Sequence, residues 1–365
     1  MTRRSAGILL SLALLAASGC GKKGPILAPL VRVPQTVQDL SLSRVGNRVI
    51  LNWTNPEAYI DGNPLQGLSE IEIWVIGEAG PAGAPAGRPA EGDFEKKGRI
   101  LMKIPAAGPA PAAEKAPVPR QGAAVLEPDP GEMNAKFLFF SLRARDGKRR
   151  VSDFSDPAVL EPGPAPVPPR GLKAAVFEDH IELGWSPPGG PADAGASKIA
   201  GYNVYRSEGE GPPLRLNMTP LAAPGFQDGN FAFGKVYVYF VRSARGVAPG
   251  AVESEDSESI KVEPVDKFPP AAPQGLTTIT GEGFIALSWE PAKEPDLAGY
   301  RVWRREPGRT KPVLLKELSP AENSYSDTEV ENRKQYVYAI TAFDRAGNES
   351  GRSAEAAGLA RRPRA

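Results

Sequence analysis

The chain has 365 residues, and its 44 Lys and Arg side chains nearly balance its 43 Asp and Glu side chains. Because these charges are dispersed and form no basic stripe, the composition argues against a nucleic-acid binder. Glycine and proline supply 39 residues each, which indicates many turns and few long helices.

The first 20 residues have the layout of an export signal. Arg3 and Arg4 precede an apolar run from Ala6 to Ala17, and Cys20 closes the segment. The run is well short of the ~20 residues that a helix needs to cross a bilayer. We therefore expect residues 1–19 to be a cleaved signal peptide.

This segment resembles a bacterial lipoprotein signal, because Ala17-Ser18-Gly19 leads into a cysteine that is the only one in the chain. The resemblance implies that the Cys20 sulfur is diacylated, that cleavage occurs before it, and that the new amino terminus is acylated. Residues 20–33 would then form a lipidated tether, with membrane lipid as the first partner. The alternative is an ordinary secretory signal, with Cys20 removed or left as a thiol.

The residues after the lipidation site give a second resemblance. Cys20-Gly21-Lys22-Lys23-Gly24-Pro25-Ile26 is similar to the opening of short Gram-negative lipoproteins of the outer membrane. The resemblance implies an outer-membrane location, with the periplasmic or surface face left open. A protein of that group accompanies the lipopolysaccharide-inserting translocon. An accessory subunit of an outer-membrane assembly machine is therefore an alternative function.

The rest of the chain repeats one order of motifs three times. Each unit opens with a proline-rich entry, continues with a strand that ends in apolar-x-Trp, and adds a second strand after a loop. The three tryptophans are Trp53, Trp185 and Trp289. Near the end of each unit, apolar residues alternate with period two, which is typical of a half-buried strand. The fold class is therefore all-β.

The repeated pattern resembles the fibronectin type III domain. The resemblance implies three tandem immunoglobulin-like β-sandwiches with the tryptophans in their cores. Tyr237 and Tyr336 match the tyrosine on strand F whose hydroxyl caps a nearby backbone turn. The expected domains cover residues 34–162, 166–264 and 268–358, followed by a basic tail at 359–365.

The first unit departs most from the pattern. Leu138 stands where the capping tyrosine is expected, and a Pro/Ala/Gly-rich insert runs from Gly77 to about Ala124. Within the insert, we expect Phe94–Pro105 to supply one or two strands, with solvated linker on both sides. Sequence drift in a surface loop that tolerates insertions explains the insert, and a ligand-binding loop is the alternative.

The sequence offers little catalytic chemistry. His180 is the only histidine and lies beside Asp179, which favours a solvated turn residue. With Cys20 acylated, no Cys/His set remains for a metal or a nucleophile. The acidic run Glu253–Glu258 favours an exposed loop over a catalytic carboxylate pair. We expect a protein that is not an enzyme, with no metal and no cofactor besides the covalent lipid.

One set of aromatic residues points to binding. Trp74, Tyr205 and Trp303 occupy the same place in the second strand of each unit, one residue beyond an inward pair, so they should face outward. We predict that they form a binding face of aromatic platforms for a protein or a glycan. The alternative is that Arg and Lys stems, or an adjacent domain, cover each ring.

The expected function is therefore that of an outer-membrane-anchored lipoprotein. Its fibronectin-III-like domains would act as a non-catalytic binding or spacer module in the cell envelope. The assembly-machine subunit is the first alternative. Accessory domains of a carbohydrate-acting enzyme are the third possibility.

Overall fold

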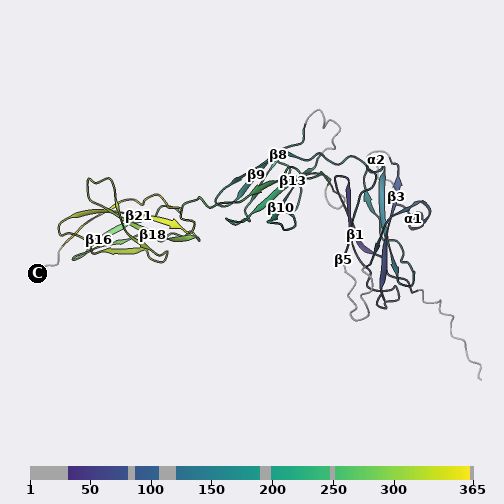
Figure 1. Ribbon diagram of the computed structural model, residues 1–365, viewed down its shortest axis with the longest axis horizontal. Coiled ribbons are helices and arrows are strands. Elements are labelled where there is room, and N and C mark those ends of the chain that lie inside the picture. Colours follow the sequence, from purple (N-terminus) through teal and green to yellow (C-terminus); the bar gives the residue numbers. More distant parts are fainter. Residues whose placement is uncertain (1–31, 81–86, 107–120, 190–198, 247–250, 362–365) are drawn as a thin grey trace, which may run out of the picture. The chain divides into compact units, whose positions relative to one another are not determined.

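The computed structural model describes residues 32–80, 87–106, 121–189, 199–246 and 251–361. The expected signal, Cys20 and residues 20–31 of the tether lie outside the described residues, as do residues 362–365 of the tail. The described residues form 22 strands and two short helices, which confirms the all-β class (Figure 1). No helix in these ranges is both long and apolar enough to span a bilayer.

The first sandwich packs two antiparallel sheets. One sheet has the order β1-β2-β5, in which β2 pairs with both neighbours. Its strands are β1 (Gln38–Val45), β2 (Arg48–Thr54) and β5 (Gln121–Leu126). The other sheet has the order β4-β3-β6-β7. Its strands are β3 (Leu68–Glu78), β4 (Arg99–Pro105), β6 (Phe137–Asp146) and β7 (Ala158–Leu160).

The insert in the first sandwich is more ordered than the sequence predicts, and it contains a helix, α1 (Glu91–Lys97). The expectation of strand from Phe94 is therefore wrong for Phe94–Lys97, and only Arg99–Pro105 forms a strand. The helix is stabilised at its start, where the Asp93 carboxylate accepts the Ala90 N–H at 3.0 Å. Lys97 pairs with the same carboxylate at 3.2 Å, one turn later.

The second helix, α2 (Pro130–Ala135), precedes β6. The Asp129 carboxylate accepts the Glu132 N–H at 2.8 Å, and a proline occupies the first turn. Both features are standard helix-start signals, because the first N–H groups of a helix have no partner within it.

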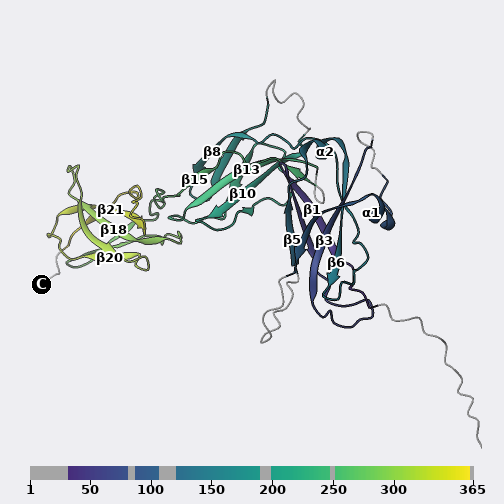
Figure 2. The ribbon, with the colours of Figure 1, turned by 45° about the vertical axis from the view of Figure 1, so that its right-hand side comes forward.

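The second sandwich follows the same plan (Figure 2). One sheet has the order β12-β9-β8. Its strands are β8 (Arg170–Val176), β9 (Ile181–Ser186) and β12 (Gly225–Asp228). In the other sheet β10 pairs with β11 and β13, and β13 also pairs with β14 and β15. Its strands are β10 (Gly201–Glu208), β11 (Leu214–Arg215), β13 (Tyr237–Arg245), β14 (Val252–Glu253) and β15 (Ile260–Val262).

The third sandwich is the most regular. Its sheets have the orders β16-β17-β20 and β19-β18-β21-β22. The first contains β16 (Thr277–Thr280), β17 (Ile285–Ser288) and β20 (Ser324–Asp327). The second contains β18 (Leu297–Arg305), β19 (Val313–Leu318), β21 (Gln335–Asp344) and β22 (Ala356–Leu359). The chain thus contains tandem fibronectin-III-like β-sandwiches.

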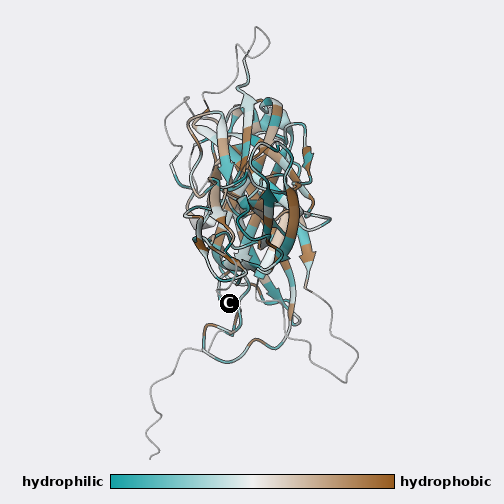
Figure 3. Ribbon diagram, turned by 90° about the vertical axis from the view of Figure 1, so that its left-hand side faces the viewer, coloured by the Kyte–Doolittle hydropathy of each residue, from teal (hydrophilic) through white to brown (hydrophobic). Residues whose placement is uncertain are grey.

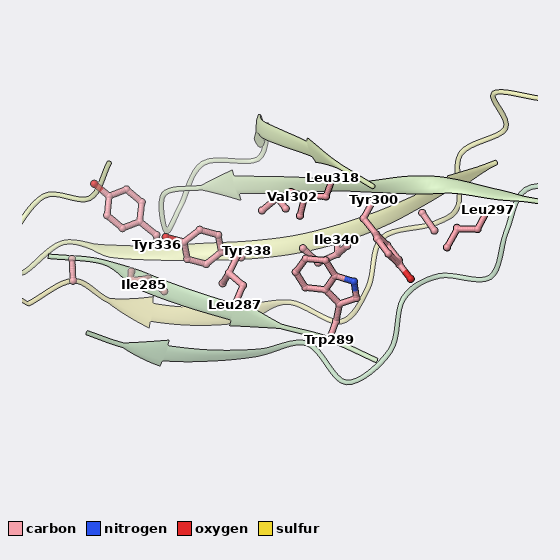
Figure 4. Close-up of a cluster of buried hydrophobic side chains, with 12 residues drawn as sticks. Ile285, Leu287, Trp289, Leu297, Tyr300, Val302, Leu318, Tyr336, Tyr338 and Ile340 are labelled. Carbon is pink, nitrogen blue, oxygen red and sulfur yellow. The ribbon is translucent and has the colours of Figure 1, made fainter. Parts of the chain in front are cut away.

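Each core is built around the expected tryptophan. Trp53, Trp185 and Trp289 are all buried between their two sheets. In the third sandwich the indole of Trp289 meets the ring of Tyr300 edge-on, with ring centres 5.4 Å apart (Figure 4). Figure 3 shows apolar and polar residues interspersed over the strands. Buried and more exposed residues alternate in strands such as β9, whereas β6 is buried on both faces because the insert adds an outer apolar cluster.

The tyrosine prediction is confirmed in two sandwiches. The Tyr237 hydroxyl accepts the Ala232 N–H at 2.9 Å, and the Tyr336 hydroxyl accepts the Glu331 N–H at 3.1 Å. In the first sandwich Leu138 takes this position and is fully buried. The corresponding backbone cap is therefore lost there, because leucine has no hydroxyl group.

The second and third sandwiches share a buried polar cluster that the first lacks. The Tyr338 hydroxyl and the Arg304 guanidinium both donate to the Asp327 carboxylate at 2.8 Å. The corresponding residues in the second sandwich are Tyr239, Arg206 and Asp228. The same register positions in the first sandwich hold Phe140, Val75 and Leu126.

A serine pair also recurs, and the sequence analysis did not identify it. In each sandwich two serines three residues apart accept backbone N–H groups from the strand that carries the alternating core residues. The pairs are Ser152 and Ser155, Ser254 and Ser257, and Ser350 and Ser353. They hold the segment after that strand against its edge, where regular pairing is interrupted.

Candidate functional site

The three predicted aromatic residues occupy equivalent positions. Trp74 lies on β3, Tyr205 on β10 and Trp303 on β18. Each lies opposite an equivalent residue of the neighbouring long strand: Ser141, Phe240 and Ala339. All three rings are on the outer face of their sheet, and each is half-buried rather than fully exposed.

Trp74 is partly covered by the helix of the insert. Its ring meets Phe154 edge-on at 5.5 Å, and Phe154 stacks on Phe94 of α1 at 5.2 Å. Phe94 is almost fully buried and belongs to a small apolar cluster on this face. The insert therefore adds a second, smaller core outside the sandwich.

A buried carboxylate anchors Trp74. The Trp74 Nε1–H donates to Glu72 at 3.1 Å, and the Arg143 guanidinium lies 5.1 Å from the Trp74 ring centre. Glu72 is 1% exposed and also accepts from Arg143 and from Arg145. Burial raises the pKa of Glu72, but the hydrogen bonds from Arg145, Trp74 and Arg143 outweigh it and lower that pKa to about 2.

Tyr205 is held in a similar way by different residues. Its hydroxyl donates to Glu253 at 2.9 Å, and its ring stacks on Phe240 at 5.0 Å. The Arg242 guanidinium lies 4.6 Å from the ring centre and donates to the same Glu253. Burial and the adjacent Glu253 carboxylate raise the pKa of the Tyr205 hydroxyl. Tyr205 is therefore a neutral donor at physiological pH.

The placement of Glu253 corrects the sequence analysis. The acidic run was expected to be an exposed loop, but Glu253 lies on β14 and is buried. It pairs with Ala244 of β13 in the sheet, and it also accepts a hydrogen bond from Asn203. The three donors around it explain why this carboxylate is stable out of solvent.

The indole of Trp303 is linked to the carboxylate of Glu349 through the hydroxyl of Thr341. Its Nε1–H donates to Thr341 at 2.9 Å, and Thr341 donates to Glu349 at 2.5 Å. The Arg352 guanidinium lies 5.7 Å from a Trp303 ring centre. Arg301 also donates to Glu349, at 2.5 Å.

The three sites share one arrangement in spite of their different residues. In each, the polar atom of the aromatic ring is tied to a glutamate, directly or through one hydroxyl, and an arginine lies over the ring. Coverage by arginine is the alternative that the sequence analysis left open. Each sandwich therefore carries an arginine–aromatic pair in a fixed geometry on its outer face. Binding at these residues stays a prediction.

Two carboxylates of the third sandwich and one of the segment before it have the spacing of a cation site. Oxygens of Asp266, Asp296 and Asp344 all lie within 4.8 Å of one another. The Asn348 side-chain amide donates to Asp344 at 2.8 Å and to Asp266 at 3.4 Å. His180 takes no part in such a group within the described residues. It stacks on Phe177 and contacts Asp179 at 2.6 Å.

Comparison with known proteins gives partial matches. No family model matches the chain. Exoglucanase B of Cellulomonas fimi is 30% identical over 197 residues, which cover 52% of this chain and 16% of the enzyme. An amylopullulanase of Thermoanaerobacterium thermosulfurigenes is 34% identical over 93 residues, which cover 25% of this chain and 5% of the enzyme. The chain thus spans less than a fifth of the length of these curated relatives.

Among solved structures, a two-domain fibronectin type III segment of chicken tenascin is similar to part of the chain. The TM-score is 0.35 and the identity 17%, covering 53% of this chain and 99% of that segment.

Proposed function

We propose that the chain is a non-catalytic binding and spacing module of the bacterial cell envelope, anchored to the outer membrane through an acylated Cys20. The observation that carries the binding role is the arginine–aromatic pair, which recurs at one register position in all three sandwiches. A different set of hydrogen bonds holds the ring in each sandwich, and the pair is nevertheless present in all three.

The chemistry of these pairs suits recognition. Tryptophan, tyrosine and arginine dominate binding energy at protein interfaces. Because each ring is already held by a hydrogen bond, a partner would lose less side-chain entropy on binding. The partner is an envelope protein or a glycan. The names of the relatives, an exoglucanase and an amylopullulanase, favour the glycan. Their activity is not transferred, because the match covers so little of either enzyme.

The test is capture from envelope extracts by the full mature protein. We expect Trp303→Ala and Tyr205→Ala each to reduce capture of the specific partner by about tenfold or more, as for interface hot spots. Leu214→Ala is the matched control, because Leu214 is 63% exposed and lies opposite Arg206, which faces the other side of the sheet from Tyr205. Circular dichroism checks that each variant remains folded.

Two outcomes would overturn this function. Capture of an assembly-machine component that survives both aromatic changes but requires residues 20–30 would favour the assembly-machine subunit. Turnover of an envelope polysaccharide by the purified protein would favour the enzyme.

A further inference from the structure

The end of the first sandwich from which the tether leaves brings three segments together around Tyr59. Pro34 forms a β-bridge with Tyr59, and the Ile60 N–H donates to the Val33 carbonyl at 3.0 Å. Arg150, from the loop after β6, donates to the Tyr59 hydroxyl at 3.0 Å. We call this end the tether-end tip, and we define it by Arg32, Ile60, Lys148, Arg149 and Arg150.

In the tip, two acidic side chains are buried and the basic side chains are more exposed. Asp61 and Asp146 lie beneath the surface, with side chains 7% and 1% exposed, and they pair with Arg32 and Arg150. Lys148 and Arg149 are exposed. No carboxylate among the described residues pairs with either of them. Glu57 is the one exposed acid in the loop after β2. Of the four basic groups of the tip, Arg32 and Arg150 are therefore paired with carboxylates, and Lys148 and Arg149 are exposed without one in the part of the chain that the structure describes.

The third sandwich contains the same turn with a single basic residue, Arg345, which stands where the first sandwich has Gly147. Asp146 accepts the Arg150 N–H at 2.9 Å, just as Asp344 accepts the Asn348 N–H at 2.8 Å. The residue before that donor has a positive φ in both turns, +63° at Arg149 and +92° at Gly347. The first sandwich thus has Lys-Arg-Arg where the third has Ala-Gly-Asn.

The arginine at position 149 is unfavourable for the turn itself. Glycine adopts a positive φ at little cost, whereas a residue with a Cβ is strained there. Strained backbone of this kind occurs often at functional sites. The turn itself therefore does not require a basic side chain at position 149.

We infer that the tether-end tip docks on the anionic headgroups of the leaflet that holds the lipid anchor. This inference rests on the proposed acylation of Cys20. The 12 residue-to-residue steps from Cys20 to Arg32 can span at most about 40 Å. The tip therefore stays within reach of the membrane. Its basic groups match anionic headgroups, and Ile60, which is 56% exposed, fits the apolar interface.

The experiment uses the acylated mature protein in vesicles with a dye on one introduced cysteine. Cys20 is the only native cysteine, so an acylated chain takes a dye only at the new site. Gln66→Cys labels the tip, because Gln66 is exposed next to Gly67, whose carbonyl accepts from the turn at Gly147. Asn47→Cys is the control at the far end of β1, roughly 26 Å away along eight strand residues. Lipids with a spin label near the headgroup quench the dye.

In vesicles that contain phosphatidylglycerol, we expect strong quenching at position 66 and weak quenching at position 47. The paired change Lys148→Ala and Arg149→Gly copies the turn of the third sandwich, so the fold should persist. It should lower the ratio of docked to free tip by about 25-fold, or fivefold for each charge removed. High salt or pure phosphatidylcholine should have a similar effect.

Equal quenching at the two positions, or quenching at position 66 that is unchanged by lipid charge or by the paired change, would overturn the docking. A chain that takes two dyes or does not remain with the vesicles would instead refute the proposed acylation. The two failures are therefore distinguishable.

Discussion

At the scale of single residues, the buried polar cluster shows how the sandwiches diverge. Tyr338, Arg304 and Asp327 come from three strands, and the first sandwich replaces all three equivalents with apolar residues. A partial replacement would leave a buried carboxylate without its donors, which is costly. The sequence analysis did not find this cluster, because only the strand register brings the three residues together.

We predict that Tyr338→Phe lowers the free energy of unfolding of the third sandwich by roughly 1–2 kcal/mol, because it removes a donor from a buried carboxylate. The triple change Tyr338→Phe, Arg304→Val and Asp327→Leu copies the first sandwich and should recover part of that loss. Hydrogen exchange of β21 amides in the full chain measures both. A triple variant no more stable than the single variant would contradict the coupling.

The Glu72 carboxylate makes the stability of the first sandwich depend on pH. Its pKa is lowered from 4.5 to about 2 on folding. The folded state therefore binds the proton less tightly than the unfolded state does, so the stabilisation is fully present above pH 4.5. It is lost as the pH falls from 4.5 towards 2.

We predict that Glu72→Gln flattens the dependence of the unfolding temperature of this sandwich on pH in that window. Glu95→Gln is the control, because Glu95 pairs with the same Arg143 but is 63% exposed. Calorimetry of the full chain between pH 2 and 6 makes the comparison. An unchanged slope in Glu72→Gln would mean that other groups cause it.

At the scale of elements, the sequence predicted the strands well and the insert poorly. Period-two alternation located the strands around Trp53, Trp185 and Trp289, because each strand buries one face. Helix α1 is seven residues long, too short to show a helical period. It forms because Phe94 packs on the outer face of β3, and this tertiary contact is not visible in the local sequence.

We predict that Phe94→Ala detaches α1 and costs about 3–5 kcal/mol of local stability, as for other buried phenylalanines. Trp74 should then become more exposed, with a red shift of its fluorescence and faster exchange of the amides of α1. Phe177→Ala is the control, because Phe177 is 40% exposed in a turn of the second sandwich. Exchange in α1 that stays slow would show that the helix does not depend on this contact.

At the scale of the whole molecule, three sandwiches repeat one scaffold and differ both in their cores and on their outer faces. The sequence predicted the outward position of Trp74, Tyr205 and Trp303, because alternation fixes which face a strand residue takes. It did not predict the glutamates that hold the rings, because these come from different strands in different sandwiches. Glu72 is two residues from Trp74, whereas Glu253 is 48 residues from Tyr205.

The proposed membrane anchor and the proposed docking of the tether-end tip both rest on the acylation of Cys20. The most direct test is the intact mass of the protein purified from envelope membranes, with sequencing of its amino-terminal peptide by tandem mass spectrometry. The account predicts a chain that begins at Cys20 and carries a diacylglyceryl group on sulfur and a third acyl chain on nitrogen. A chain with an unmodified thiol at Cys20, or one that begins after it, would contradict the account.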